Sequence, residues 1–322
     1  MAGTAGVTPQ LDASDLLASV PAAHEIAEIE AVAFRRVPSC ELTFADCIAL
    51  ATHIRASHGA GAAGVVITQG TDTIEETSFA LDLLLGATKP VVVTGAMRHP
   101  LLPGADGSAN LLAAIHVAAA DVTVGLGCVV VLNDEIHAAR FVRKTNTSNP
   151  AAFSSSGAGA LGWVFEGRPH VVVRPVQLEP ALLERVVAFA HAEGSGQPPV
   201  PRVALVKLGL GDDGGLLEHL ESRGYAGLVV EGMGGGHVPS GVVAILENLA
   251  GRIPVVLASR AGAGEVLRAT YSYSGAEVDL LNRGLIRAGY LDGLKARVLL
   301  SLQLAAGADS HEIVTAFSRF SA

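Results

Sequence analysis

The stretch that decides the fold is residues 65–77, which read VVITQGTDTIEET. Its first four residues predict a buried strand, and the following Gln-Gly pair turns the chain. Thr71 and Asp72 then fall where a helix begins. A hydroxyl and a carboxylate are therefore expected at the carboxyl end of a strand, where open α/β sheets bind ligands. Both residue types are also favoured helix caps, so the position alone leaves a structural role equally open.

Length and composition predict a folded protein of two domains. The chain has 322 residues, of which 50% are hydrophobic and only 4% aromatic, and this length exceeds that of one typical core. A net charge of −9, without a run of Lys and Arg, argues against a nucleic-acid surface. No apolar run reaches the length that spans a membrane. We therefore expect neither a nucleic acid nor a membrane as a partner.

The cysteines and the first residues indicate a reducing compartment. Cys40, Cys47 and Cys128 match neither a disulfide framework nor the spacing of a zinc site. The chain begins MAGTAG, which lacks the charged and apolar regions of a signal peptide. We therefore expect a cytoplasmic protein without a bound metal.

Apolar runs and helical patterns alternate along the chain. The strand-like runs are Val65–Thr68, Val91–Thr94, Cys128–Leu132, Val171–Val173, Val203–Val206, Leu228–Val230 and Val255–Ala258. The helical patterns are Thr77–Leu85, Ser108–Ala120, Leu182–Ala192, Leu216–Ser222 and Gly241–Leu249. This alternation predicts an α/β fold, in which mostly parallel sheets carry helices on both faces.

Two segments interrupt this alternation. Residues 193–202 read EGSGQPPVPR and have the composition of a linker. They would separate a larger N-terminal domain, residues 1–192, from a C-terminal domain, residues 203–322. Residues 129–153 predict a β-hairpin excursion within the first domain. Lys144 lies in this excursion, where a lone lysine is by default a solvated charge.

Several separated motifs occur in an order typical of one family. They are TDT at 71–73 with EET at 75–77, VTGAMR at 93–98, ADG at 105–107 followed by NL at 110–111, KTNT at 144–147, GAEVD at 275–279 and KARVLL at 295–300. Over nearly the whole chain this set resembles the bacterial asparaginase/glutaminase family of homotetrameric threonine amidohydrolases. The resemblance implies hydrolysis of the side-chain amide of L-asparagine, or of L-glutamine, without a metal or an organic cofactor.

The resemblance also assigns the catalytic roles. Amide hydrolysis needs an activated nucleophile, a base, and donors for the developing oxyanion. By resemblance, Thr71 is the hydroxyl beside the amide carbon and Lys144 accepts its proton, while Asp72 holds Lys144 or grips the α-amino group of the substrate. A lysine acts as a base only where its pKa is lowered, which burial beside a hydroxyl would do.

Further residues are implied as substrate contacts. Ser39 matches the serine of the family that contacts the substrate α-carboxylate. The next position commonly carries Gln but is Cys40 here, a departure that bears on the preference between asparagine and glutamine. Gly70 and Ala96 fall in the same implied site. Glu277 matches an acidic residue that reaches the site of the neighbouring subunit, so the resemblance implies a dimer or tetramer.

A glycine-rich run follows one of the predicted strands. Residues 231–237 read EGMGGGH, which superficially resembles a nucleotide-binding loop. No acidic residue about twenty positions further on completes such a unit, so we do not expect NAD binding. In the family this turn lies near the shared active site and often carries Asn at the position of His237. His237 is therefore a candidate substrate contact, and a structural histidine is equally compatible with the pattern.

One family motif is missing from the sequence. The family opens with a strand ending in Thr-Gly-Gly-Thr-Ile-Ala, one of whose threonines is acylated by substrate, and no such motif occurs here. Thr4 is not a substitute, because no strand precedes it. We therefore expect the chain to start one strand late, with residues 4–9 as the loop after that strand and residues 12–17 as the first helix.

Two explanations of the missing motif stay open. The start is an internal methionine of a longer reading frame, or the chain is a homologue that binds an amino acid without hydrolysing amides. The retained Thr71, Asp72 and Lys144 favour the first. An amidotransferase subunit acting on aminoacyl-tRNA is a third reading, which the net negative charge disfavours.

Overall fold

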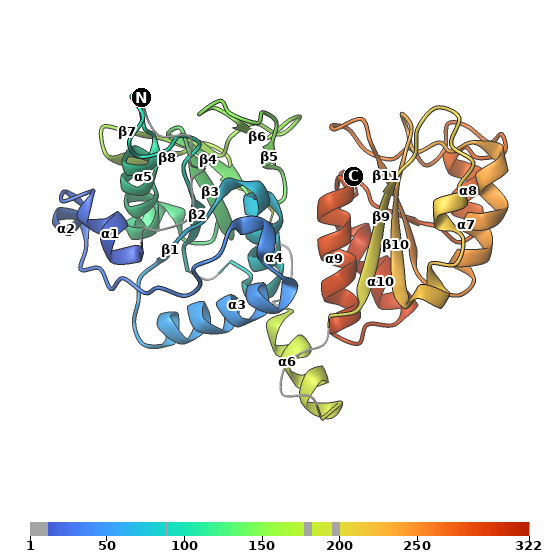
Figure 1. Ribbon diagram of the computed structural model, residues 1–322, viewed down its shortest axis with the longest axis horizontal. Coiled ribbons are helices and arrows are strands. Elements are labelled where there is room, and N and C mark those ends of the chain that lie inside the picture. The colour runs from blue at the N-terminus through green and yellow to red at the C-terminus, as the bar shows by residue number, and fades with distance from the viewer. Residues whose placement is uncertain (1–11, 88, 177–181, 195–199, 322) are drawn as a thin grey trace. The chain divides into compact units, whose positions relative to one another are not determined.

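The computed structural model describes residues 12–87, 89–176, 182–194 and 200–321. Contacts between residues divide the chain into two compact units, Met1–Ala181 and Leu182–Ala322. Each unit contains a main sheet with helices on both faces (Figure 1), so the predicted α/β class is confirmed. Thr4, the expected loop at residues 4–9, and residues 195–199 of the expected linker lie outside the described residues.

The first unit begins with the predicted first helix and contains a mixed sheet. Its helices are α1 (Ala13–Ala18), α2 (Ala23–Ile26), α3 (Phe44–Gly59), α4 (Ile74–Leu85) and α5 (Gly107–Ala119), with short 3-10 turns η1 (Ser39–Glu41), η2 (Thr71–Thr73) and η3 (Asp121–Thr123). Its strands are β1 (Val65–Thr68), β2 (Val91–Thr94), β3 (Cys128–Leu132), β4 (Glu135–Ala138), β5 (Arg143–Lys144), β6 (Phe153–Ser154), β7 (Gly162–Phe165) and β8 (Arg168–Val171).

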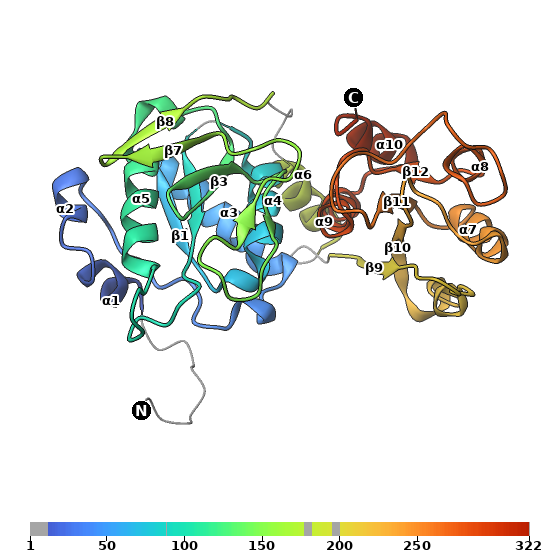
Figure 2. The ribbon, with the colours of Figure 1, turned by 90° about the horizontal axis from the view of Figure 1, so that it is seen from above.

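The main sheet of this unit has the strand order β1-β2-β3-β4-β7-β8. The strands β1, β2 and β3 pair in parallel, which explains why β2 and β3 are apolar and buried almost throughout. Figure 2 shows α5 on one side of this sheet and α3 and α4 on the other. The carboxyl ends of β1 and β2 coincide, because Thr68 is paired with Thr94. The loops that follow both strands therefore start at one edge of the sheet.

The predicted excursion follows β3. Strand β4 returns antiparallel to β3, with Leu132 paired to Glu135. The two turn residues, Asn133 and Asp134, have φ angles of 53° and 60°, a left-handed conformation that Asn and Asp tolerate and that tight hairpins need. The chain then forms β5 and β6, an antiparallel pair separate from the main sheet. Lys144 is therefore a residue of a short hairpin.

The second unit has a wholly parallel sheet. Its helices are α6 (Leu183–Ala192), α7 (Val243–Ala250), α8 (Glu277–Asn282), α9 (Gly293–Ala305) and α10 (Ser310–Ser318), with 3-10 turns η4 (Gly215–Leu217), η5 (Glu221–Arg223) and η6 (Ser240–Val242). The strands β9 (Arg202–Lys207), β10 (Tyr225–Gly232), β11 (Val255–Ser259) and β12 (Ile286–Arg287) lie in the order β12-β11-β10-β9. Figure 1 shows α9 and α10 on one face and α7 and α8 on the other.

Two predicted elements differ from the structure. The helix expected at Leu216–Ser222 is instead two separate 3-10 turns, because His219 between them has a φ angle of 67°, which interrupts helical geometry. The strand expected at Val171–Val173 lies earlier, at Arg168–Val171. A tight turn at Glu166 and Gly167, both with positive φ, fixes its start by pairing it with β7.

The boundary between the units also differs from the linker that composition indicates. Helix α6 packs on α9, with the ring of Phe189 against Gly307. Arg185 of the same helix donates to Glu312 at 2.9 Å. These contacts group α6 with the second unit, so the division falls at Ala181–Leu182 and precedes residues 193–202.

Candidate active site

Thr71 and Asp72 lie in η2, directly after the turn at the end of β1. The turn is held by the Gln69 N–H, which donates to the Thr94 carbonyl at 3.1 Å. Gly70 lets Ser39 approach closely, because a Cβ on Gly70 would lie 2.8 Å from the Ser39 hydroxyl oxygen. The Ser39 hydroxyl in turn accepts the Asp72 N–H at 3.3 Å. Buried Ser39 thus fixes the backbone that presents Thr71 and Asp72.

Lys144 reaches the same place from the β5–β6 hairpin. The hairpin pairs Lys144 with Phe153 and is extended by the Thr145 N–H, which donates to the Ala152 carbonyl at 2.7 Å. The Lys144 Nζ lies 2.9 Å from Thr71 Oγ1 and 2.7 Å from Asp72 Oδ1. The structure therefore brings Thr71, Asp72 and Lys144 together, and we name these three residues the lysine cluster.

The two charged groups of the lysine cluster differ in exposure. The Lys144 side chain is 16% exposed, whereas the Asp72 side chain is 68% exposed. The ammonium donates to both the hydroxyl and the carboxylate, so its position is fixed from two sides. A hydroxyl within hydrogen-bond distance of an amine is the arrangement that nucleophilic catalysis uses. The exposed side of Asp72 leaves the cluster open to a ligand.

A buried histidine ties the hairpin to the main sheet. Ser155, which follows β6 directly, has its hydroxyl 3.0 Å from Nδ1 of His137 on β4. The other ring nitrogen lies 3.1 Å from a Glu135 carboxylate oxygen without the alignment of a hydrogen bond. Burial lowers the pKa of His137, although Glu135 acts in the opposite direction. A neutral imidazole therefore anchors the hairpin that carries Lys144.

The loop after β2 carries Ala96 and is held by Asp106, which sequence reasoning did not place in the site. The Asp106 carboxylate accepts the N–H groups of Met97 and Arg98, both at 2.9 Å. Asn110 Nδ2 donates to the Gly95 carbonyl at 3.0 Å. Asp106 precedes α5, so in the sequence it has the signature of a helix cap, which hides this role. The ADG motif at residues 105–107 was the sequence feature that could have indicated this role.

Ser39 and Cys40 begin η1 and differ in exposure. Ser39 is buried, and its carbonyl accepts the Thr73 hydroxyl at 3.0 Å. Cys40 is an exposed free thiol. A thiol is a weak hydrogen-bonding group, so Cys40 offers a ligand less than the glutamine that the family resemblance implies at this position.

His237 and Glu277 lie in the second unit and contact each other. The glycine-rich run forms a tight turn in which Met233 and His237 exchange backbone hydrogen bonds at 2.8 Å, and this turn directs His237 toward α8. His237 Nε2 lies 3.1 Å from Glu277 Oε2. On the other side of the ring, Nδ1 lies 3.0 Å from the Tyr273 hydroxyl, and the Tyr271 ring packs edge-on at 5.2 Å. We name these four residues the histidine cluster.

Glu277 is the fixed point of the histidine cluster. Its side chain is fully buried, and Oε1 accepts the N–H groups of Thr270 at 2.8 Å and Tyr271 at 2.7 Å. Burial acts to raise the pKa of this carboxyl, but the N–H donors of Tyr271 and Thr270 lower it overall. Sequence reasoning missed both tyrosines, for which the aromatic pair at positions 271 and 273 was the only available signal.

The comparison with known proteins decides the family. The family model "Asparaginase, N-terminal" matches residues 1–177, and "Glutaminase/Asparaginase C-terminal domain" matches residues 202–317. The chain belongs to the asparaginase/glutaminase family. The family predicted from the sequence is therefore confirmed.

Asparaginase relatives extend over most of the chain. A Bacillus licheniformis protein named L-asparaginase is 34% identical over 291 residues, which cover 90% of this chain and 86% of that protein. L-asparaginase 2 of Escherichia coli strain K12 is 34% identical over 258 residues, covering 80% and 70%. The crystal structure of a probable cytoplasmic L-asparaginase from Campylobacter jejuni superposes with a TM-score of 0.85 at 31% identity, covering 96% of this chain and 94% of that one.

The described residues form neither a metal-binding group nor a membrane-spanning helix. Within the ranges that the structure describes, no group of three or more His, Cys, Asp and Glu side chains is arranged to hold a metal ion. Across the same ranges, every helix is too short or too polar to cross a membrane.

Proposed function

We propose that this protein hydrolyses the side-chain amide of L-asparagine to give L-aspartate and ammonia. The observation that carries the proposal is the lysine cluster, in which the Lys144 Nζ lies 2.9 Å from the Thr71 hydroxyl. Family membership and the names of its relatives supply the substrate. L-Glutamine is the second amide to be tested.

The proposed reaction uses the threonine hydroxyl as the nucleophile. Thr71 Oγ1 attacks the side-chain amide carbon, and its proton passes to Lys144 in the amine form. The tetrahedral intermediate then expels the amide nitrogen, which takes this proton and leaves as ammonia. Water hydrolyses the resulting ester, which releases aspartate and restores the hydroxyl. Asp72 keeps Lys144 in place during both steps through its 2.7 Å contact.

The substrate backbone would be held beside the nucleophile. We assign the α-carboxylate to the η1–η2 region, where Ser39 and Gly70 meet and where Cys40 is exposed. The loop of Ala96, fixed by Asp106, would close the other side. We propose that a neighbouring copy contributes His237, held by the buried Glu277, so we also propose a dimer or tetramer. A cytoplasmic location agrees with the three free thiols.

Ammonia release from L-asparagine and from L-glutamine tests the function on the full chain. We expect turnover that falls by at least about a thousandfold in Thr71→Val, which keeps the shape of the side chain but removes the hydroxyl. Thr52→Val is the matched control, because within the described part of the chain the Thr52 hydroxyl bonds to nothing beyond the Ile48 carbonyl of its own helix.

A different outcome would identify the alternative function. If calorimetry shows that L-asparagine binds but no ammonia appears, the chain is an amino-acid-binding homologue without the hydrolytic step. Light scattering that gives only the mass of a single chain would remove the proposed contribution of a neighbouring copy.

A further inference from the structure

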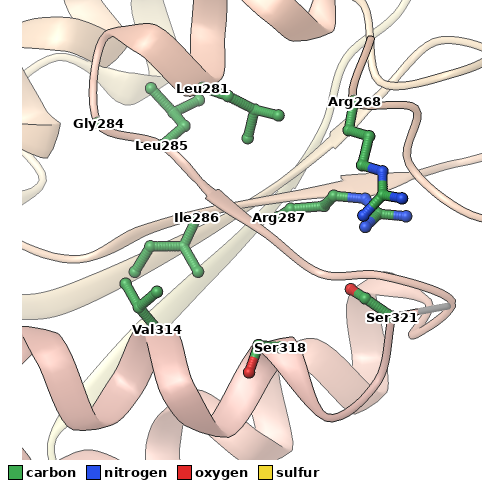
Figure 3. A pocket seen from close by; sticks show the side chains of 9 residues that line it. All are labelled: Arg268, Leu281, Gly284, Leu285, Ile286, Arg287, Val314, Ser318 and Ser321. Carbon is green, nitrogen blue, oxygen red and sulfur yellow. The ribbon is translucent and has the colours of Figure 1, made fainter.

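A cavity of about 520 Å³ lies at one edge of the sheet in the second unit (Figure 3). It is bounded by the edge strand β12, by the segment that leads into it from α8, and by the last turns of α10. The volume lies in the range of sites for small ligands. None of the residues that line it belongs to the lysine cluster or the histidine cluster. Its chemistry therefore needs a separate explanation.

Two arginines give the cavity a cationic end. Arg287 projects from β12, and Arg268 comes from the loop that precedes α8; Figure 3 shows both guanidinium groups at the same end of the cavity. Arg287 is 16% exposed and is held by the Val266 carbonyl at 2.6 Å and by the Glu265 carboxylate. Arg268 is exposed, and among the described residues no ion pair neutralises it. Arg287 is thus held in place by its partners, whereas the positive charge of Arg268 is not paired with a carboxylate of the described residues.

The charge of this cavity is opposite to that of the protein. The chain carries 31 acidic and 22 basic residues, yet the lining contains two arginines and neither Asp nor Glu. Glu265 balances Arg287, which leaves the charge of Arg268 in excess. Two guanidinium groups at one end repel each other, and a bound anion would remove this repulsion while accepting their N–H groups. The favoured ligand therefore carries a negative group.

The other end of the cavity is apolar. Leu281 and Val314 face it from the two helices, and Ile286 lies on the strand between them (Figure 3). Val314 is 49% exposed, so a ligand placed here would cover apolar surface that is now open to solvent. We propose that this cavity binds a small organic anion, with a carboxylate or phosphate group on Arg268 and Arg287 and an apolar body on Leu281, Ile286 and Val314.

Isothermal titration of the full chain with hexanoate and with hexyl phosphate tests the site. We expect saturable binding of one anion per chain at concentrations up to about 10 mM. The stronger of the two ligands identifies the preferred head group. Hexylamine, which has the same tail and the opposite charge, should not bind. Arg268→Ala should weaken binding by about tenfold or more, because it removes a charged hydrogen-bond partner. Val314→Asp should also weaken binding, because it places a carboxylate where the apolar tail of the ligand would lie.

The matched control is Arg202→Ala. Arg202 lies on β9, the opposite edge strand of the same sheet, with its guanidinium over the Tyr225 ring at 4.2 Å. This variant should bind hexanoate as the unchanged protein does. Absence of saturable heat from both anions would overturn the site, as would equal binding by hexylamine or by Arg268→Ala. A change of oligomeric mass in Arg268→Ala would also overturn it and would identify the edge as a contact between copies.

The test of the anion site is independent of the test of amide hydrolysis. Lys144→Met should bind hexanoate with unchanged affinity even where it releases no ammonia, because the cavity contains no residue of the lysine cluster. If asparagine turnover fails while hexanoate still binds and Arg268→Ala weakens it, only the proposed function is lost.

Discussion

The lysine cluster and the histidine cluster are built from similar groups but differ in how completely their hydrogen bonds are satisfied. In the first, the Asp72 carboxylate is 68% exposed and accepts from Lys144 through one oxygen. In the second, the Glu277 carboxylate is fully buried, and both oxygens have partners. An open, incompletely satisfied group can exchange partners with a substrate, whereas a closed one holds a single geometry. We therefore propose that the lysine cluster performs the chemistry and that Glu277 positions His237 in the histidine cluster.

Replacing the amine of the lysine cluster should have the largest effect. Lys144→Met removes the proposed proton acceptor and should lower ammonia release from L-asparagine by roughly a thousandfold or more, with thermal stability nearly unchanged. The matched control is Lys89→Met, because the Lys89 ammonium donates to the carbonyls of His58 and Ala62 and, among the described residues, to no other group. Turnover in Lys144→Met close to that of Lys89→Met would remove Lys144 from the chemistry.

Replacing Glu277 should mainly lower stability, whereas replacing Asp72 should mainly lower activity. Glu277→Ala leaves the buried N–H groups of Thr270 and Tyr271 without an acceptor, and we expect it to lower the free energy of unfolding by roughly 2–3 kcal/mol. Asp72→Ala removes an exposed side chain and should change that free energy by less than about 0.5 kcal/mol, while lowering turnover. Urea unfolding of both variants measures the difference. Equal losses of stability would contradict the comparison.

Acid should disturb the first unit through His137. Because burial lowers the pKa of His137, the unfolded chain binds a proton first as the pH falls. The stability contributed by neutral His137 is therefore present above its ordinary pKa of 6.5 and is lost as the pH falls from there toward the folded-state value. The fluorescence of Trp163, the single tryptophan, reports on the first unit, because β7 pairs with β4.

The control for this acid sensitivity is His137→Gln. It keeps a polar partner for Ser155 without the titration, so the midpoint of urea unfolding should change less between pH 7 and about pH 5. A pH dependence identical to that of the unchanged protein would show that His137 does not control the stability of the hairpin.

The smallest effect is expected at Tyr273, the exposed tyrosine of the histidine cluster that bonds to His237. Tyr273→Phe removes the hydroxyl that lies 3.0 Å from His237 Nδ1, on a side chain that is 55% exposed. We expect the free energy of unfolding to fall by about 0.5–1 kcal/mol, and ring packing against His237 to persist. A loss as large as that of Glu277→Ala would mean that the tyrosine, rather than the buried carboxylate, fixes this cluster.

The sequence predicted those parts of the fold that depend on local pattern. The apolar runs at Val65–Thr68, Val91–Thr94 and Cys128–Leu132 are strands with the same bounds in the structure. The second and third of these strands are buried throughout, as a continuous apolar run predicts, whereas the first is a partly exposed edge strand. The family was also predictable, because ordered motifs along the whole chain carry more information than any single one.

Other features depend on contacts that no local pattern records. The break at His219 comes from a positive φ at a residue that usually allows a helix. Asp106 has the signature of a helix cap but holds the Ala96 loop through the N–H groups of Met97 and Arg98. The pairing of Glu277 with His237 joins residues 40 positions apart. The roles assigned to Ser39, Thr71 and Lys144 stay predictions until the variants are measured.

The different environments of the three cysteines give this protein a built-in labelling position. Burial raises the pKa of Cys47 to about 12 and that of Cys128 well above its usual range, whereas the thiol of Cys40 is exposed. A maleimide dye would therefore attach at Cys40. Since Cys40 follows Ser39 directly, the emission of such a dye would report ligand binding beside Ser39 in real time, without any engineered thiol.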